Sequence, residues 1–307
     1  MAASAKLLNV SVIQIISHPA LDETRRGIQD QLQIEGFKDK INMTWRYENA
    51  QGNMALALQI AQKFAGENAD IIIAIPTAAA QAAISATRSK PIPIVFASVT
   101  DPVGSQIVSN LKKPGNNVTG VSNLTPITPQ FKIFKKIIPT LKRIGVIFNP
   151  GEMNSVALNE IMVKEASKMG LEIVTASASK ISEVKAATES LVPKVDCFFI
   201  NNDSTALAAF DSIVKVGVNE KRPVFVSDTD IVKKGAVAAW GPNQYELGKQ
   251  AGALAAQVLR GENPGDLPVQ FPIQQELEIN LDAARKMGVV IPKELIKRAG
   301  NFVLCGK

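Results

Sequence analysis

The sequence has one histidine, two cysteines and few aromatic residues. A single histidine, His18, excludes a histidine-based metal site and is the one base that a Ser-His-Asp triad could use. Cys197 and Cys305 stand far apart and do not form a disulfide framework. The motifs G-x-S-x-G, C-x-x-C and H-E-x-x-H and a glycine-rich phosphate loop are all absent. We therefore expect no enzyme, no metal ion and no cofactor.

Long apolar runs are also missing, since no stretch approaches the roughly 20 residues that cross a bilayer. Residues 1–6 do not form a signal peptide, but an export signal can be removed, so this absence does not assign a compartment. The formal charge of +6 comes from scattered Lys and Arg. Nucleic-acid binding needs a concentrated basic stripe, so we expect none. At 307 residues, with 46% hydrophobic and 20% charged residues, the chain is typical of a globular protein with two domains.

One stretch of the chain occurs twice. Residues 69–83 read ADIIIAIPTAAAQAA, and residues 195–209 read VDCFFINNDSTALAA, so that a shift of 126 positions takes Thr77 to Asp203. Each copy has an apolar run, a few small polar residues and then a helix former, which predicts a buried parallel strand followed by a helix. Ligands of open α/β sheets bind beyond the carboxyl ends of such strands.

The flanking segments repeat the same plan. We expect strands near 7–16, 41–47, 93–98 and 118–124 in the first half and near 144–148, 171–176, 223–228 and 235–241 in the second, with helices between them. Pro223 falls 130 positions after Pro93. Pro126 and Pro129 interrupt the pattern, and we place the first crossing between two lobes there. The sequence therefore predicts a duplicated α/β fold with mainly parallel sheets.

Several motifs together resemble the substrate-binding proteins of ABC importers, and the tryptophan/tyrosine-type family in particular. They are SHPALDETRRG, PIVFASVTDPVG, GNNVTGVSN, IGVIFNPGEMNS, VDCFFINNDST and LEINLDAARKMGVVIP. The resemblance implies a type I periplasmic-binding-protein fold, with two Rossmann-like lobes, three hinge crossovers and closure on a small ligand, commonly an aromatic amino acid. It assigns residues 1–124 and about 243–274 to one lobe, and residues 125–242 and about 275–307 to the other.

The chemistry of a free amino acid suggests which residues bind it. Its carboxylate suits the helix start at Thr77, Ala78 and Ala79, where backbone N–H groups and a hydroxyl are available. Its ammonium group suits the carboxylate of Asp203, with Asp101 and Asp228 as further candidates. The rest of the expected polar shell, at other strand ends, consists of Ser17, His18, Ser98, Asn149, Asn154, Asn202 and Ser204.

Each of these assignments has a structural alternative. The hydroxyls of Thr77 and Ser204 and the carboxylate of Asp203 suit helix caps, and Asp101 before Pro102 suits a turn. His18 suits a hydrogen bond within its loop. The aromatic rings of Trp240 and Tyr245 suit either stacking on an aromatic ligand or packing in the hinge or core.

Two functions follow from this reading. The first is the periplasmic or extracytoplasmic binding component of an ABC importer, either free or lipid-anchored, monomeric, and partnered by a membrane permease. The second is a cytoplasmic effector-sensing domain of a transcription regulator without its DNA-binding head, because sugar-type repressors share the two-lobed fold. A hydrophobic export signal upstream of Met1 would support the first, and a DNA-binding head the second.

Overall fold

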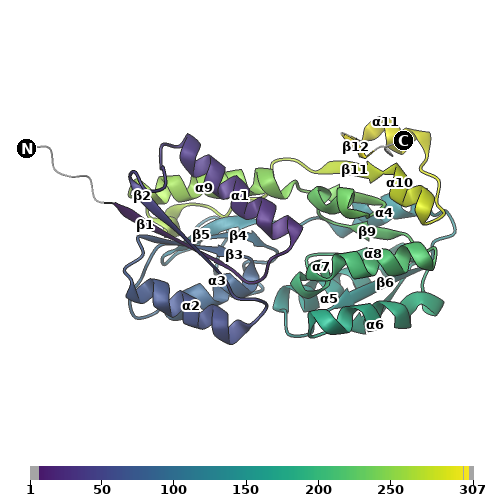
Figure 1. The fold of residues 1–307 in the computed structure, drawn as a ribbon, viewed down its shortest axis with the longest axis horizontal. Coiled ribbons are helices and arrows are strands. Elements are labelled where there is room, and N and C mark those ends of the chain that lie inside the picture. The colour runs from purple at the N-terminus through teal and green to yellow at the C-terminus, as the bar shows by residue number, and fades with distance from the viewer. Residues whose placement is uncertain (1–6, 300, 304–307) are drawn as a thin grey trace, which may run out of the picture. The chain divides into compact units, whose positions relative to one another are not determined.

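The computed structural model describes residues 7–299 and 301–303, and Figure 1 shows its helices and strands. The chain divides into two compact units. The first unit comprises residues up to Leu124 together with Gln244–Ile273, and the second comprises Thr125–Asn243 together with the chain from Gln274 onward. The chain therefore passes between the units three times, after Leu124, Asn243 and Ile273.

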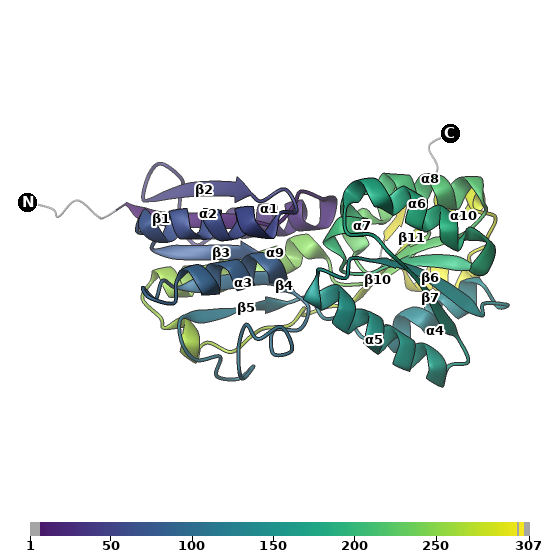
Figure 2. The ribbon, with the colours of Figure 1, turned by 90° about the horizontal axis from the view of Figure 1, so that it is seen from below.

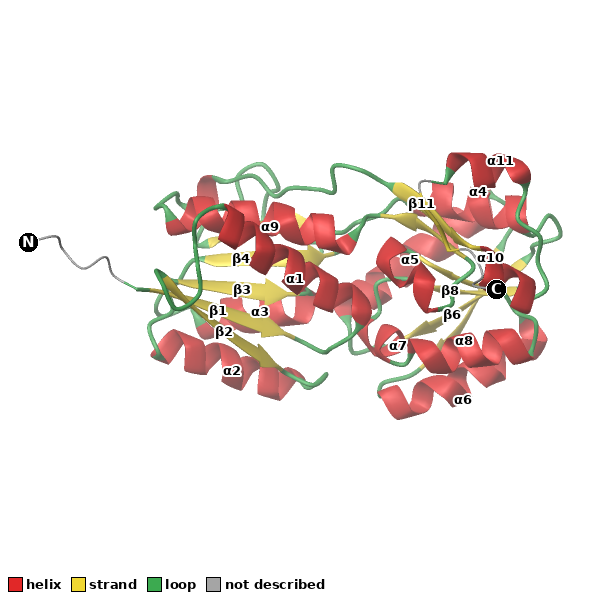
Figure 3. Ribbon diagram, turned by 45° about the horizontal axis from the view of Figure 1, so that its top comes forward, coloured by secondary structure: helices red, strands yellow, loops and turns green. Residues whose placement is uncertain are grey.

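The first unit is a five-stranded sheet of parallel strands in the order β2-β1-β3-β4-β5. Helices α1 and α9 pack together on one face, and α2 and α3 pack together on the other (Figure 3). The elements are β1 (Leu8–Gln14), α1 (Pro19–Ile34), β2 (Met43–Asn49), α2 (Met54–Gly66), β3 (Ile71–Ile75), α3 (Thr77–Ala86), β4 (Ile94–Val99), β5 (Val118–Ser122), α9 (Gln244–Leu259) and the 3-10 helix η3 (Pro264–Asp266).

The second unit is a seven-stranded sheet in the order β12-β11-β10-β9-β8-β6-β7, in which only the β10–β11 pair is antiparallel among the described strands. Helices α4 and α5 lie on one face and α6 and α8 on the other (Figure 2). The elements are α4 (Ile127–Ile137), β6 (Arg143–Phe148), α5 (Met153–Lys168), β7 (Glu172–Ser177), α6 (Ile181–Leu191), η1 (Val192–Lys194), β8 (Cys197–Ile200), α7 (Ser204–Ala208), α8 (Phe210–Asn219), β9 (Val224–Val226), η2 (Thr229–Lys234), β10 (Ala238–Gly241), β11 (Glu276–Asn280), α10 (Leu281–Lys286), α11 (Lys293–Arg298) and β12 (Asn301–Val303).

The duplication predicted from the sequence is confirmed by the strand order. Numbered along each half, the strands run 2-1-3-4-5 in the first unit, and β7-β6-β8-β9-β10 repeats that order in the second. The copies differ after their third strand, where one helix, α3, corresponds to the two helices α7 and α8. The predicted α/β fold class with two sheets is therefore correct.

Helix α4 is an element that the sequence pattern did not predict. Pro126 and Pro129 were expected to interrupt the chain, but Pro126 is the N-cap residue and Pro129 lies in the first helical turn. The N–H groups of a first turn have no partner within the helix, so proline is tolerated there. The buried face of α4 includes Phe131 and Phe134, and the ring of Phe134 stacks on Phe225 with centroids 4.2 Å apart.

The cores of both units are built from the apolar strands. All five residues of β3 have no exposed surface, and Phe198 and Phe199 of β8 are likewise fully buried. Cys197 is a buried free thiol, as predicted, and burial raises its pKa. Cys305 lies outside the described residues.

Glycines allow α1 and α9 to approach each other closely. A Cβ atom added at Gly248 of α9 would lie 2.2 Å from the backbone oxygen of Thr24, and one added at Gly27 of α1 would lie 2.1 Å from that of Tyr245. Since backbone atoms cannot move aside as a side chain can, any larger residue must push the two helices apart.

We therefore expect Gly248→Ala to lower the free energy of unfolding by about 2 kcal/mol, measured by urea denaturation. Gly66→Ala is the matched control, because a Cβ atom added at Gly66 meets nothing within 4 Å. Equal stability of the two variants would contradict this packing.

Candidate ligand-binding site

In each sheet the strand order reverses direction between two neighbouring strands. In the first unit this point lies between β1 and β3, and in the second it lies between β6 and β8. In sheets of this order ligands bind at that point, beyond the carboxyl ends of the strands. The structure brings the predicted residues to the carboxyl edges of their sheets. In the first unit these are Ser17, His18, Thr77, Ala78, Ala79, Ser98 and Asp101, and in the second Asn149, Asn154, Asn202, Asp203, Ser204 and Asp228.

Helix α3 begins at Thr77 without a side-chain cap. Its N-cap residue is Pro76, which has no side-chain hydrogen-bonding group, so the capping alternative for Thr77 is wrong. The Thr77 side chain is 1% exposed, and its Oγ1 has no hydrogen-bond partner among the described residues. The first helical N–H groups, of Thr77, Ala78 and Ala79, have no carbonyl acceptor within the helix. This helix start therefore combines an unpartnered hydroxyl with the positive end of a helix dipole.

Asp203 occupies the corresponding position in the second unit and is fully engaged by donors of the protein. Its Oδ1 accepts from the Ala206 N–H at 2.7 Å, and its Oδ2 accepts from the Asn149 N–H and the Ser155 hydroxyl, each at 2.6 Å. Asp203 is 3% exposed, and burial raises the pKa of its carboxyl group. It caps α7 and ties the loop after β6 to the loop after β8, so the capping alternative is correct for Asp203.

Glu152 is a second carboxylate at this edge, which the sequence reading missed. Its Oε2 accepts from the Ser204 N–H at 3.0 Å, and its Oε1 accepts from the Thr205 N–H at 3.2 Å and the Thr205 hydroxyl at 3.0 Å. Burial, together with the neighbouring Asp203 carboxylate, raises the pKa of Glu152 to about 7. The first N–H groups of α7 are thus occupied by side chains of the same unit, unlike those of α3.

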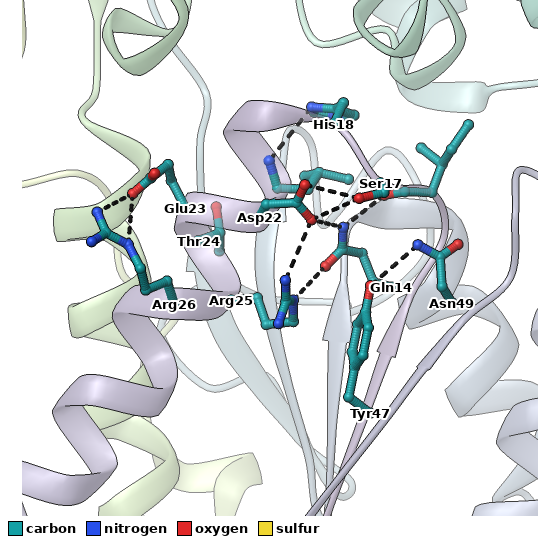
Figure 4. A network of polar contacts seen from close by, with 12 residues as sticks. Gln14, Ser17, His18, Asp22, Glu23, Thr24, Arg25, Arg26, Tyr47 and Asn49 are labelled. Carbon is teal, nitrogen blue, oxygen red and sulfur yellow. Dashed lines mark hydrogen bonds and ion pairs between the residues drawn. The ribbon is translucent and has the colours of Figure 1, made fainter.

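A polar network supports the carboxyl ends of β1 and β2 (Figure 4). Gln14 has no exposed surface, and its amide nitrogen donates to the Ile16 carbonyl and the Asp22 carboxylate at 2.7 and 2.9 Å. Its amide oxygen accepts from Arg25 Nε at 3.2 Å, and the Arg25 guanidinium lies 4.3 Å from the centre of the Tyr47 ring. Ser17 donates to Asp22 at 2.8 Å. Apart from Ser17, the sequence reading did not select these residues.

His18 is the N-cap residue of α1. Its Nδ1 accepts from the Leu21 N–H at 3.5 Å, as the loop hydrogen-bond alternative predicted. The side chain is 4% exposed, and burial lowers the pKa of His18 to about 4 despite the opposing effect of Asp22. The imidazole is therefore neutral at pH 7, and its second nitrogen, Nε2, is a hydrogen-bond donor.

Most of the remaining predicted residues have hydrogen-bond partners within their own units. Ser98 donates to Gln244 Oε1 at 2.8 Å, and Asp101 accepts from the Gly104 N–H at 2.8 Å, as a turn residue does. Asn154 donates to the Asn202 carbonyl at 2.7 Å. The Tyr245 hydroxyl donates to Asp30 at 2.9 Å, and its ring lies against Arg26 of the same helix, α1. The other predicted positions are Asn149, which donates to Thr205 at 2.8 Å, Asp228, the buried N-cap residue of η2, and Trp240, which is half-buried in β10.

Residues 7–299 and 301–303 contain no group of three or more His, Cys, Asp or Glu side chains that could hold a metal ion. Within the same residues, the helices are all too short or too polar to cross a bilayer. A hollow of about 790 Å³ lies in the first unit between the end of α3 and the loop from Val103 to Ser109, but it contains none of the predicted residues.

Known proteins resemble this chain along nearly its whole length. Residues 9–303 match the family described as ABC transporter substrate binding protein. A tyrosine-binding protein of Clostridioides difficile (strain R20291) is 37% identical over 92% of this chain and 82% of its own. The crystal structure of an ABC domain in complex with L-Trp from Streptococcus pneumoniae is 33% identical, with a TM-score of 0.92, and covers 97% of this chain and all of that one.

A crystal structure of a conserved domain protein from Vibrio cholerae is 42% identical, with a TM-score of 0.94, over 97% of this chain and all of its own. More distant solute-binding proteins share the type I periplasmic-binding-protein fold. Their identity is below 25%, so they bear on the fold alone.

Proposed function

Because the chain belongs to the family of ABC transporter substrate-binding proteins, we propose that it is the binding component of an ABC importer for an aromatic amino acid. Relatives that bind tyrosine or contain L-Trp support this choice of ligand. Membership of a transport family is also the reason to prefer this function to that of a transcription regulator. In this proposal the protein acts outside the cytoplasm, as a monomer or lipid-anchored monomer, and delivers its ligand to a membrane permease.

The observation that carries the proposal is the contrast between two corresponding strand ends. The start of α3 offers a helix dipole, free N–H groups and the unpartnered Thr77 hydroxyl, all of which favour an anion. The corresponding edge in the second unit holds the carboxylates of Glu152 and Asp203, which favour a cation. A free amino acid carries both charges and matches both edges.

Binding would then be coupled to a movement of the two units about their three connections. A ligand that contacts both units only in a closed form shifts the population toward that form by its differential affinity. The other proposed contacts are the carboxyl-edge residues predicted from the sequence. The permease would recognise the closed form.

The test is a calorimetric titration with each of the twenty amino acids, followed by small-angle X-ray scattering with the ligands that bind. We expect micromolar or tighter binding of L-tryptophan, L-tyrosine or L-phenylalanine and a smaller radius of gyration in the complex. Tight binding without compaction would exclude the closure mechanism, and no binding of any amino acid would exclude the proposed ligand class.

Thr77→Val should make the ligand-free protein more stable and bind its ligand more weakly. Replacing an unpartnered buried hydroxyl with a methyl group is expected to raise the free energy of unfolding of the ligand-free protein by about 1 kcal/mol. The loss of a donor to the ligand carboxylate should weaken L-tryptophan binding about tenfold. Urea denaturation and calorimetry measure the two effects.

Thr87→Val, at the C-cap residue of the same helix, is the matched control. The Thr87 hydroxyl is buried but donates to the Ala83 carbonyl at 2.9 Å, so its replacement should lower stability and leave the dissociation constant unchanged. If Thr77→Val binds L-tryptophan as tightly as Thr87→Val does, Thr77 does not contact the ligand.

A further inference from the structure

The hollow at the end of α3 is separate from the sheet edge at which the amino acid is proposed to bind. Thr77 begins α3, whereas Ile84 and Thr87, at the other end of the helix, line the hollow. The helix has ten residues and is therefore about 15 Å long. All the residues that line the hollow belong to the first unit, so the hollow is complete within that unit.

Hydrogen bonds behind the hollow hold its wall in place. In the loop of residues 103–109, the Ile107 N–H donates to the Pro102 carbonyl at 2.9 Å. The Gln81 side chain donates to the Ser105 carbonyl at 3.2 Å and so ties this loop to α3. The volume of about 790 Å³ lies within the range of roughly 300–1,000 Å³ that small-molecule pockets have. The hollow is therefore a preformed cavity of a size that a small molecule can fill.

Part of the lining is apolar. Ile107 and Val108 are each 6% exposed, and Val118 is 3% exposed. Val103 also lines the hollow and keeps 43% of its surface exposed. Covering such side chains with an apolar molecule removes them from water, which favours binding. This part of the lining therefore suits the apolar body of a ligand.

The polar part of the lining consists of side chains without partners. Arg88, Gln106, Ser109 and Asn116 line the hollow, and their side chains make no hydrogen bond or ion pair with other described residues. Arg88 is the only charged residue of the described lining, which contains no carboxylate. A guanidinium group has five donors and no acceptor, and its shape matches carboxylate, sulfonate and phosphate groups. The polar part therefore suits an anionic group.

We propose that this hollow binds a small organic anion. Arg88 holds the negatively charged group, and Ile84, Val103 and Ile107 contact the apolar body. An inorganic anion would leave the apolar side chains uncovered, and a neutral apolar molecule would leave the guanidinium without a partner. The site is additional to the one proposed for the amino acid, and neither requires the other.

The test uses two fluorescent probes that differ by one charged group. 8-Anilinonaphthalene-1-sulfonate has aromatic rings and a sulfonate group, and N-phenyl-1-naphthylamine has the same rings without the sulfonate. We expect the wild type to bind the sulfonate probe with a dissociation constant below about 100 μM. Arg88→Gln should bind this probe roughly tenfold more weakly and the neutral probe as the wild type does, because only the charged contact is lost. Arg143→Gln, at another exposed arginine without a side-chain partner in the described chain, is the matched control and should change neither constant.

A second pair of variants locates the probes in the hollow. Ser109→Trp puts a large side chain into the lining at an exposed position and should weaken the binding of both probes at least about tenfold. Ser85→Trp, at an exposed residue of α3 outside the lining, should leave both constants unchanged. Melting temperatures measured without probe show whether each variant is folded.

Four results would overturn the inference. They are the absence of sulfonate-probe binding by the wild type, an equal effect or no effect of Arg88→Gln on the two probes, unchanged binding by Ser109→Trp, and displacement of the sulfonate probe by L-tryptophan. The last result would place the probe in the amino-acid site. The proposed function is tested separately by the calorimetric titration with amino acids, so either proposal can fail while the other stands.

Discussion

Glu152→Gln is expected to remove about 3 kcal/mol of pH dependence from the stability of the ligand-free protein between pH 4.5 and 7. In the unfolded chain Glu152 ionises near its ordinary pKa of 4.5, whereas in the folded protein it keeps its proton until about pH 7. The stability linked to this group is therefore fully present below pH 4.5 and is lost as the pH rises through 7. The glutamine variant has no proton to lose.

Urea denaturation at intervals between pH 4.5 and 8 measures this effect as the difference between variant and wild type. Glu278 also has a pKa raised to about 7, by burial and by Asp230, so the wild-type curve alone does not isolate Glu152. The difference curve does, because Glu278 is common to both proteins. A flat difference curve for Glu152→Gln would show that Glu152 ionises near its ordinary pKa.

His18→Asn is expected to change the acid side of the profile by a similar amount, about 3 kcal/mol, with the opposite sign. The unfolded chain binds a proton at His18 near pH 6.5, but the buried imidazole stays neutral until about pH 4. Stability linked to His18 is therefore present above pH 6.5 and is lost as the pH falls through 4. Asparagine keeps an acceptor for the Leu21 N–H, because it is a favourable N-cap residue, but it does not titrate.

The measurement is the free energy of unfolding of His18→Asn and wild type between pH 4 and 7.5. The wild type should lose stability relative to the variant on acidification, and parallel curves would contradict a buried neutral imidazole. His18 and Glu152 lie in different units and give opposite slopes over the same pH range. If the units unfold together, the contribution of His18 offsets part of the opposite contributions of Glu152 and Glu278 in the wild type, so His18→Asn should have the steepest pH profile of the three proteins.

The fold could be predicted from the sequence because its signals are local. Apolar runs such as Ile71–Ile75 and the repeated stretch at Cys197–Ile200 specify buried strands, and the repeat specifies two sheets. The errors are local as well. Helix α4 was not predicted, because in sequence a proline in the first turn of a helix looks the same as a proline that breaks a helix. The division of the second copy into α7 and α8 was not predicted either, because no residue there indicates it.

The candidate site could be predicted only in part. The loops that follow the strands could be predicted, because parallel strands have their carboxyl ends at the same edge of a sheet. This rule is enough to locate Thr77 and Asp203 at that edge, even though their contacts are not known from the sequence. Glu152 was missed because its donors, Ser204 and Thr205, stand 52 and 53 positions further along the chain. The role of Gln244 depends on Ser98, 146 positions away. Partners at such separations leave no periodic signal.

The close packing of α9 on α1 has a consequence for biosynthesis. Helix α9 covers one face of the first sheet, yet it is made only after most of the second unit has left the ribosome. A nascent chain that ends near Leu124 therefore exposes the apolar surface that Gly248 and its neighbours later cover. Until α9 has been made, the first sheet lacks one of the helices that cover it, whereas residues 125–243 already contain β6 to β10.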